Sequence, residues 1–489
     1  MLKIRDVVEI ILLVIKEMHQ ILTTCQDFAE LEKRIYRLVQ TITLKLLLTA
    51  CNYLDEELMK SRDKERLKLI HTKTREIITP IGEVMFKRRY YRDLKTGEGR
   101  YLLDEALGLA PRQRLSPWTT EIAVHVAAEM PYHKGAILLK ELTLGAVDIR
   151  AMTIWEEAQE AGKKLLEQAE EERQAVFDRG ELPKGRRQSR ELRVEADEVW
   201  VAGRDNGKGR RKIAIKIGVG YEGKVKVGQN RRSLQERQVV AGVTEGKVFW
   251  EEVIAQLGRR WDLSAVEEYY VGGDGASWIK QGLEYFPRAT YRLDPYHLRR
   301  ALLEGLGHNE AAYKEVSEAL IKGDWAEVDK ALSAAERKSK GVERRRITKL
   351  RHYLKNNWEG ICQTKATERL GAIEGQVFHH IARRMKRHGA RWSNKGADHL
   401  ARLLAARANG ELKEATRLFW QAQPETIRLA VGEKPIRAEG RKHGQDPEEW
   451  LRASVPALYG PASGEPWVKY GECKSFCVNG KAAYKMGIL

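Results

Sequence analysis

Cysteine is scarce in this chain of 489 residues, which contains five cysteines. An odd number of cysteines without the spacing of a disulfide framework is typical of free thiols, so we expect a protein of the reducing cytoplasm. Cys473 and Cys477 form a C-x3-C pair, but no second pair completes a zinc shell. We assign this pair no metal. The other cysteines stand singly: Cys25, Cys51 and Cys362.

A long hydrophobic run is missing at the N-terminus. The stretch MLKIRDVVEIILLVIKEM resembles a signal peptide, but Glu9 interrupts it and only the six residues from Ile10 to Ile15 are continuously apolar. No small-residue cleavage site follows. Because a membrane-spanning helix needs roughly 20 apolar residues, we expect an amphipathic helix here and no insertion into a membrane.

Acidic side chains are in deficit, with 69 Asp and Glu against 87 Lys and Arg and a net charge of +18. Such a charge favours a polyanionic partner, because the cations neutralise phosphates and release their counterions. We expect nucleic acid as the partner and rank an acidic membrane surface second. At 42% hydrophobic content, the chain is long enough for about two to four folded domains.

The first part of the chain divides into segments by pattern. Residues 1–70 have helical periodicity and form a possible oligomerisation surface. Turn residues separate β-rich runs in 71–116, which predicts a small β-hairpin unit. Residues 117–177 are helical again. Gly, Pro, Ser and charge mix in 178–191, as in a linker, so we place a domain boundary there.

Two of these segments leave a DNA contact open. FKRRYYR, within the β-hairpin unit, interleaves bases with aromatics and either grips phosphate or forms an ordinary solvated edge strand. In residues 117–177, a short Gly-containing turn separates YHKGAILLKEL from a long helical run. This pattern predicts either a helix-turn-helix that binds DNA or a plain helical bundle.

Residues 192–408 change in character. Three strand-like runs precede a helix, and two further strands follow, each continued by a helix. The order β-β-β-α-β-α-β-α predicts an α/β RNase H-like domain. Its mixed five-stranded sheet begins as an antiparallel meander and continues by crossovers into parallel strands. The extension 409–489 has scattered Pro and Gly, and we assign it no chemistry.

Carboxylates interrupt two of the expected strands. Asp197 lies in the first strand, LRVEADEVWV, and Asp274 ends the fourth, in VGGDGAS. In the expected order these strands are neighbours, so the two carboxylates meet and repel one another unless a cation lies between them. Glu195 and Glu198 are poorer candidates: Glu195 can reach the same face as Asp197, whereas Glu198 is expected on the other face. The alternative for Asp274 is a tight turn with a surface side chain.

Glu374 is the third acidic candidate. In a helix it shares one face with Phe378, Ile381 and Met385, so it points toward the sheet, where a charge requires a cationic partner. The alternative is a frayed helix start with Glu374 in solvent. A basic flank is expected outside, where its members either contact DNA phosphates or are simply solvated: Arg383, Arg384, Lys386 and Arg387.

Three hard oxygen ligands without a matching cysteine or histidine set suit Mg²⁺ or Mn²⁺. Two such ions sharing Asp197 activate a water or a 3′-hydroxyl and stabilise the leaving oxygen at a phosphodiester. Asp294 and His297 follow the fifth strand in LDPYHL. His297 either contacts phosphate or orients the metal site, while Asp294 before Pro295 equally fits a helix cap.

At this point a family resemblance is specific. The motifs EADEVWV, GGDGASWIK, RLDPYHLRRAL and AIEGQVFHHIARRMKRHGARWSNKGADHLARLL resemble those of the ISLre-type bacterial insertion-sequence transposases. These form a DDE family allied to the Mutator-like transposases. The likeness covers nearly the whole chain, and no motif position departs from the pattern.

The resemblance implies an RNase H-like catalytic domain in which Asp197, Asp274 and Glu374 match the DDE residues. It also implies that DPYH matches a [C/D]-x2-H element placed after the second Asp. An all-helical insertion between the second Asp and the Glu is a further implication, and the helix-forming residues of about 302–370 fit it.

Three functions are then open. The first is a Mg²⁺-dependent transposase, which cuts double-stranded DNA at terminal inverted repeats and joins the ends to target DNA. It would act in the bacterial cytoplasm, associated with the nucleoid when bound to DNA, and as a homo-oligomer in the synaptic complex. The second is a non-catalytic, sequence-specific DNA-binding protein derived from a transposase. The third is a basic RNase H-like nuclease without strand transfer. Loss of cleavage with retained binding in an Asp197→Asn variant separates the first from the second.

Overall fold

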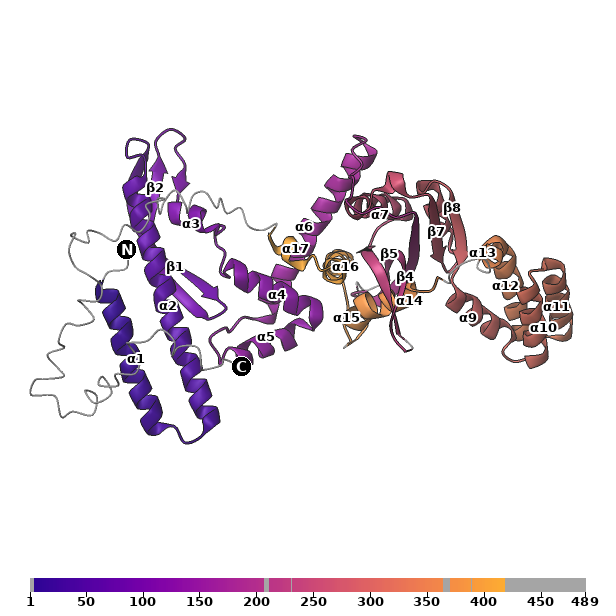
Figure 1. Ribbon diagram of the computed structural model, residues 1–489, viewed down its shortest axis with the longest axis horizontal. Helices are drawn as coiled ribbons and strands as arrows, with labels where there is room; N and C mark the ends of the chain where they lie inside the picture. The colour runs from indigo at the N-terminus through magenta and orange to yellow at the C-terminus, as the bar shows by residue number, and fades with distance from the viewer. Residues whose placement is uncertain (1–3, 206–210, 230, 364–369, 388, 418–489) are drawn as a thin grey trace, which may run out of the picture. The chain divides into compact units, whose positions relative to one another are not determined.

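The computed structural model describes residues 4–205, 211–229, 231–363, 370–387 and 389–417 (Figure 1). They belong to one compact unit that ends at Ala430. Cys473, Cys477 and most of the extension 409–489 lie outside the described residues. Within the described part, none of the helices combines the length and the apolar character needed to cross a membrane.

The N-terminal region is a pair of helices packed on a small sheet. Its elements are α1 (Ile4–Thr24), α2 (Phe28–Ser61), β1 (Leu67–Thr79), β2 (Gly82–Asp93), β3 (Gly99–Arg100) and α3 (Leu102–Leu107). Asp27 caps α2 by accepting a hydrogen bond from the Glu30 amide. The sheet has the order β1-β2-β3 and is antiparallel. The predicted helices and hairpin are confirmed, but the first strand begins a few residues earlier than expected and a third, short strand is added.

The FKRRYYR segment is built into this sheet. Arg88 forms an ion pair with Asp104, and Arg89 forms one with Asp55. Phe86 at the start of the segment is buried. The segment belongs to β2, which is the middle strand, so the expectation of an edge strand was wrong. Since its two central arginines already have carboxylate partners, the structure gives little support to a phosphate grip here.

The helices of residues 117–177 form a bundle with the C-terminal helices. They are α4 (Pro117–Glu129), α5 (Tyr132–Leu142) and α6 (Ala151–Phe177). Helix α6 packs on α4, α5, α7 (Gly246–Arg260) and α16 (Asn394–Asn409), and Gly162 lies so close to His399 that a Cβ would be 2.4 Å from its carbonyl oxygen. The exposed side of α6 includes Glu156, Glu160 and Glu170, which would repel phosphate.

This arrangement supports the bundle alternative over a helix-turn-helix. It also corrects the expected domain boundary at residues 178–191. Buried side chains of α4, α6, the large sheet and α16 share one hydrophobic core. The connection after α6 therefore joins two parts of one core and separates no independent domain.

A mixed five-stranded sheet organises the rest of the chain, with the order β6-β5-β4-β7-β8. Its strands are β4 (Glu191–Ala202), β5 (Lys212–Gly228), β6 (Arg231–Gly242), β7 (Glu268–Gly273) and β8 (Ala289–Leu293). Strand β5 pairs with β4 and with β6 in antiparallel fashion, whereas β7 pairs with β4 and with β8 in parallel. The expected neighbourhood of the first and fourth strands is thus confirmed. The β5–β6 hairpin is longer than the sequence indicated.

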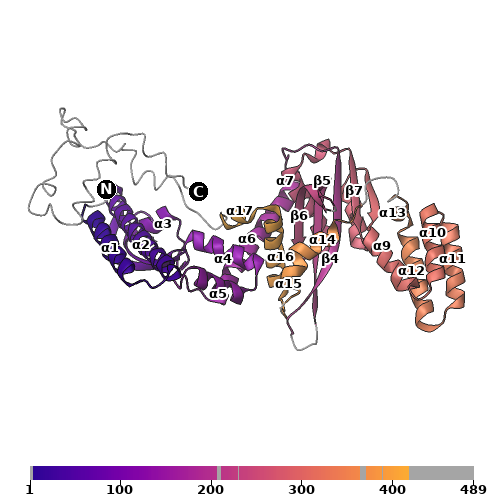
Figure 2. The ribbon, with the colours of Figure 1, turned by 60° about the horizontal axis from the view of Figure 1, so that its bottom comes forward.

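The two faces of this sheet pack on different helices, as alternation along a strand requires. Val194 and Ala196 of β4 belong to the core formed with α7 and the helices after β8. Val199 and Val201 belong to the core formed with α4, α6 and α16. Figure 2 shows α16 lying against the strands. Asp197 shares the α16-facing side of β4 with Val199.

A cluster of helices follows β8, as the family resemblance implied. Its members are α9 (Pro295–Leu306), α10 (Glu310–Lys322), α11 (Trp325–Lys338), α12 (Gly341–Asn356) and α13 (Trp358–Gln363). The chain then returns to the sheet through α14 (Ile373–Gln376), a π-helical turn (Val377–Ala382), α15 (Arg383–Met385), α16 and α17 (Leu412–Arg417). A short 3-10 turn, Leu263–Ala265, precedes β7. Helix α8 (Ser277–Lys280) and a second 3-10 turn, Gln281–Tyr285, follow it.

Candidate active site

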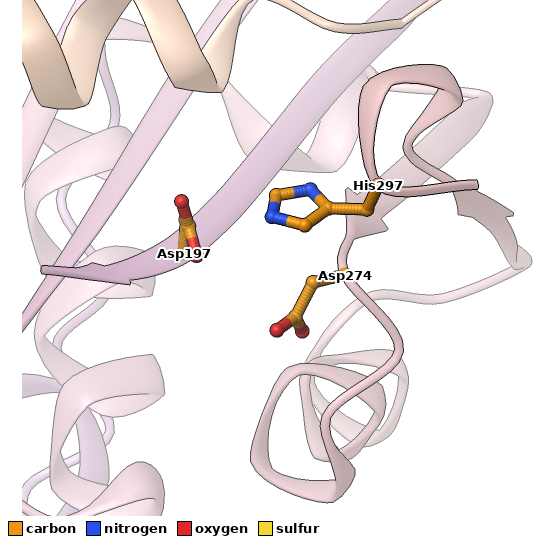
Figure 3. Close-up of side chains that lie close together, drawn as sticks. All are labelled: Asp197, Asp274 and His297. Atoms are coloured by element: carbon orange, nitrogen blue, oxygen red, sulfur yellow. The ribbon is translucent and has the colours of Figure 1, made fainter. Parts of the chain in front are cut away.

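Asp197 and Asp274 meet because their strands are paired in parallel. The register aligns Glu195 of β4 with Gly272 of β7, so two residues further along each strand Asp197 and Asp274 reach the same level. With His297 they form a group in which one oxygen or nitrogen atom of each side chain lies within 4.8 Å of the others (Figure 3). The three residues come from a strand, a loop and the start of a helix.

Asp197 is the most buried member of this group, with 8% of its surface exposed. Its Oδ1 accepts a hydrogen bond from the Glu198 amide at 2.7 Å. Burial raises the pKa of Asp197 to about 6, against the lowering effects of that amide and of His297, while the charges of Asp274 and Glu374 raise it further. A cation at this point would relieve both the desolvation and the repulsion.

Asp274 is held in a fixed loop. Its carboxylate accepts from the Ala276 amide at 2.9 Å, and its backbone carbonyl accepts from the hydroxyl of Tyr353 at 2.8 Å. Gly275 has a φ of +97°, and a Cβ there would be 2.6 Å from Oδ1 of Asn357. Tyr353 belongs to α12, and Asn357 directly follows this helix. The loop is therefore fastened by the helical insertion, and Asp274 is half-buried rather than a free surface side chain.

The helix cap expected of Asp294 is confirmed, while the role of His297 in contacting phosphate or orienting a metal stays a prediction. Asp294 is fully buried and caps α9 by accepting from the His297 amide at 3.1 Å. Its Oδ2 also lies 2.8 Å from Nδ1 of His297, which leaves Nε2 directed toward the acidic group. Burial lowers the pKa of His297, but the bond to Asp294 and the charges of Asp197, Asp294 and Glu374 outweigh it, and the pKa is raised.

Glu374 lies at the edge of the group. Its Oε1 is 3.4 Å from Nε2 of His297, and its side chain is 37% exposed. The expected apolar stripe was wrong at Phe378, which is 49% exposed, while Val377 is buried in its place. A π-helical turn begins at Val377 and adds a residue to the turn, so the period of 3.6 residues fails there. Glu374 thus points to the site and not into the apolar core.

Glu195 has a role that the sequence did not reveal. It is fully buried, and its carboxylate accepts from the amides of Gly371 at 2.8 Å, Ala372 at 3.0 Å and Ile373 at 3.3 Å. The hydroxyl of Tyr221 donates to it as well. These amides begin the helix that carries Glu374. The position of Glu195 on the face of Asp197 was visible in the strand pattern, but its partners lie far away in the chain.

The remaining sequence candidates lie outside this group. Glu198 faces away from Asp197, as expected, and pairs with Lys216 at 3.2 Å. Arg384 corrects the prediction of an outer basic flank. It is buried, donates to the Ala127 carbonyl at 2.9 Å and packs against the rings of Tyr132 and Trp392. The flank members that are exposed, as expected, are Arg383, Lys386 and Arg387.

The donor atoms of the site fit a hard divalent cation. Asp197, Asp274 and Glu374 offer carboxylate oxygens, which Mg²⁺ and Mn²⁺ prefer, and His297 offers one imidazole nitrogen. Asp197 and Asp274 lie close together, and Asp197 is buried. A cation bound between them would reduce both their repulsion and the cost of burying the charge. Among the described residues, no thiol belongs to this group.

Comparison with known proteins places the chain in a family. A UPF0236 protein of Caldanaerobacter subterraneus subsp. tengcongensis is 26% identical over 394 residues, which covers 79% of each chain. A UPF0236 protein of Streptococcus gallolyticus is 27% identical over 414 residues, which covers 81% of this chain and 86% of its own. The model of UPF0236, described as an uncharacterised protein family, matches residues 21–422. Because this match extends over most of the chain, the protein belongs to the UPF0236 family.

Proposed function

We propose that this protein is a DNA transposase of the DDE type, which cuts and joins phosphodiester bonds with the help of Mg²⁺ or Mn²⁺. The observation that carries the proposal is the meeting of Asp197, within β4, and Asp274, directly after the neighbouring parallel strand β7, with Glu374 brought near them after a helical insertion. The strand order, antiparallel and then parallel, is the order expected of an RNase H-like domain, and it supports that assignment.

The residues divide the chemistry among themselves. Asp197, Asp274 and Glu374 would hold the metal, which the sequence leads us to expect as two ions; bound there, it would polarise the scissile phosphate and activate the attacking water or 3′-hydroxyl. His297, oriented by Asp294, directs Nε2 to the same point and neutralises part of the carboxylate charge in the metal-free protein. The half-buried setting strengthens each of these electrostatic contacts.

The partner that fits is double-stranded DNA, at the terminal inverted repeats of an element and at a target. The net charge of +18 supports binding to a phosphate backbone. The name of the Caldanaerobacter relative joins eleven locus designations. An element that copies itself leaves its transposase at many loci, so a name of this kind supports the proposal. Action in the bacterial cytoplasm, as a homo-oligomer that holds two DNA ends, belongs to the same proposal.

The test is metal-dependent cleavage and joining of a labelled duplex that carries the terminal repeat of the element. The parent protein is compared with Asp197→Asn, Asp274→Asn and Glu374→Gln, and with Glu198→Gln as a control on the other face of β4. We expect cleavage and joining in the parent and the control, loss in the three site variants, and binding in all.

Two results would redirect the proposal. Binding without cleavage in every protein, under conditions that support a control transposase, identifies a DNA-binding derivative. Cleavage without joining of a pre-cut 3′-hydroxyl identifies a nuclease.

A further inference from the structure

A basic groove borders α14, the helix that carries Glu374. It has a volume of about 1110 Å³ and lies between the extended part of the β5–β6 hairpin and α14. Gly371, Gly375 and Gln376 line its helical side. Glu374 occurs between these residues in sequence, so the helix that borders the groove also carries a site carboxylate.

The hairpin side of the groove is basic because of strand register. Lys224 pairs with Leu234 and Lys226 pairs with Arg232, and directly paired residues share a face of the ribbon. Three cations are thus placed along one face. Val225 alternates with them, and it is exposed on the opposite face.

The inner end of the groove adds a further cation, Arg237. Arg237 lines the groove and donates to the carbonyl of Ala408 at 3.1 Å. Burial and the neighbouring Arg260 lower the pKa of Arg237. Close by, burial together with Arg237 and Arg407 lowers the pKa of His380 to about 4. No acidic side chain is among the described residues that line the groove.

The geometry points to this groove as the binding site for the sugar-phosphate backbone of a single DNA strand that leads to Asp197, Asp274 and Glu374. The inference rests on the proposed function and names where its substrate lies. A strand that has separated from its duplex fits better than an intact duplex, because Asp197 is only 8% exposed and a reacting phosphate must come close to it. Basic grooves that track a backbone are the usual means of holding single strands.

Binding of a fluorescent single-stranded DNA oligonucleotide, measured over a range of salt concentrations, tests the groove. The variant combines Lys224→Gln, Lys226→Gln and Arg232→Gln. Each contact with a single-strand phosphate contributes about 0.7 to the log–log salt slope, so we expect the slope to fall by about 2. Affinity should fall by about tenfold to hundredfold at moderate salt. A matched control removes the same charge from exposed lysines of the helical insertion: Lys314→Gln, Lys338→Gln and Lys340→Gln.

The outcomes separate this inference from the proposed function. An unchanged slope in the groove variant, or an equal loss in the control, overturns the groove assignment even if the parent protein cleaves DNA. Loss confined to the groove variant supports the groove, and it does so even if the parent shows no cleavage. An RNA oligonucleotide of the same sequence competing better than DNA would overturn the choice of DNA.

A separate observation concerns Glu195. Its carboxylate accepts from the three amides that begin α14. Helix α14 is where the chain comes back to the sheet after the helical insertion. We infer that Glu195 is a positioning residue: it fixes the start of α14 relative to β4, and this places Glu374 close to His297. All three amides donate to one oxygen, Oε2, so a glutamine at this position keeps the size and an acceptor but replaces charge-assisted hydrogen bonds with weaker neutral ones.

Hydrogen exchange of the segment 371–376 tests this role without any catalytic readout. We expect faster exchange in Glu195→Gln than in the parent and little change in Tyr221→Phe, which leaves the amide contacts in place. If the exchange rate of the segment stays at the parent value in Glu195→Gln, the positioning role is excluded.

A metal titration then links this position to the site. The Mg²⁺ concentration that gives half-maximal cleavage should rise about tenfold in Glu195→Gln, as for other residues that orient a metal ligand. Combining it with Glu374→Gln should add no further loss of residual activity, because both changes act through one carboxylate. A purely structural defect would add to the loss, and that result would overturn the inference.

Discussion

Glu195 and Asp197 lie two residues apart on one face of β4, but their carboxylates differ in the number of hydrogen bonds that they accept. Glu195 accepts from the amides at the start of α14 and from the Tyr221 hydroxyl. Asp197 accepts from its neighbour's amide and otherwise faces Asp274 and Glu374. The Glu195 carboxylate is thus held by several hydrogen bonds from the fold, whereas the Asp197 carboxylate has one such bond and lies near two other carboxylates.

The first prediction is that Asp197→Asn stabilises the metal-free protein at pH 7. The folded state raises the pKa of this carboxyl from 3.8 to about 6. A group whose pKa is raised on folding binds its proton more tightly in the folded state, so the fold loses stability as the pH rises from 3.8 to about 6, and the loss is complete above that pH. The gain is at most about 3 kcal/mol.

Thermal melting in the presence of a chelator measures this effect. The difference in melting temperature between Asp197→Asn and the parent should shrink as the pH falls from 7 through 6, and should vanish only below 3.8, where both the folded and the unfolded states hold the proton. Added Mg²⁺ should stabilise the parent alone. A variant that is less stable than the parent at pH 7 would show that Asp197 is well satisfied without a metal.

A second prediction concerns Tyr353, whose hydroxyl donates to the Asp274 carbonyl at 2.8 Å. Tyr353→Phe should cost about 1 kcal/mol of stability, as for one lost hydrogen bond, and should raise the Mg²⁺ requirement several-fold because the loop loosens. Tyr269→Phe is the matched control, since its hydroxyl donates to the Leu263 carbonyl at 3.0 Å, outside the site. Equal metal requirements in the two variants would contradict the role of the insertion in holding Asp274.

A third prediction separates two neighbouring arginines. Arg384 is buried between the Ala127 carbonyl and the rings of Tyr132 and Trp392. Arg384→Gln should lower stability by about 2 kcal/mol and leave the salt dependence of DNA binding unchanged. Arg383→Gln, at an exposed position, should have little effect on stability. Chemical denaturation and binding over a salt series measure both quantities, and a reversed result would return Arg384 to the DNA-contacting flank.

A fourth prediction concerns the thiols. Burial raises the pKa of Cys51 to about 11, so this thiol is almost wholly protonated at pH 8 and unreactive toward an alkylating agent. Cys25 and Cys362 are partly exposed and should react first. Peptide mass mapping after brief alkylation distinguishes them. Rapid labelling of Cys51 in the native protein would show that α2 opens from the small sheet.

Strand alternation and turn residues were enough to predict the large sheet. The order of strands placed Asp197 beside Asp274, and the register of β4 with β7 confirms this neighbourhood. These predictions succeeded because they depend on local pattern and on a short list of allowed connections. The cap formed by Asp294 was likewise visible, since both of its partners are only a few residues away.

Other features depended on contacts between distant parts of the chain. Phe378 was placed on the buried face because a regular period was assumed, and the π-helical turn breaks that period. Arg384 looked like a surface residue, because no local pattern shows that Tyr132 and the Ala127 carbonyl lie next to it. The partners of Glu195 were hidden for the same reason.

The attachment of the Asp274 loop to Tyr353 and Asn357 has a consequence for protein synthesis. The ribosome makes the strands that carry Asp197 and Asp274 first, but the groups that fasten the second of them come about eighty residues later. Glu374 comes later still. A growing chain therefore cannot assemble the group of Asp197, Asp274 and Glu374 until the helical insertion and α14 have left the ribosome.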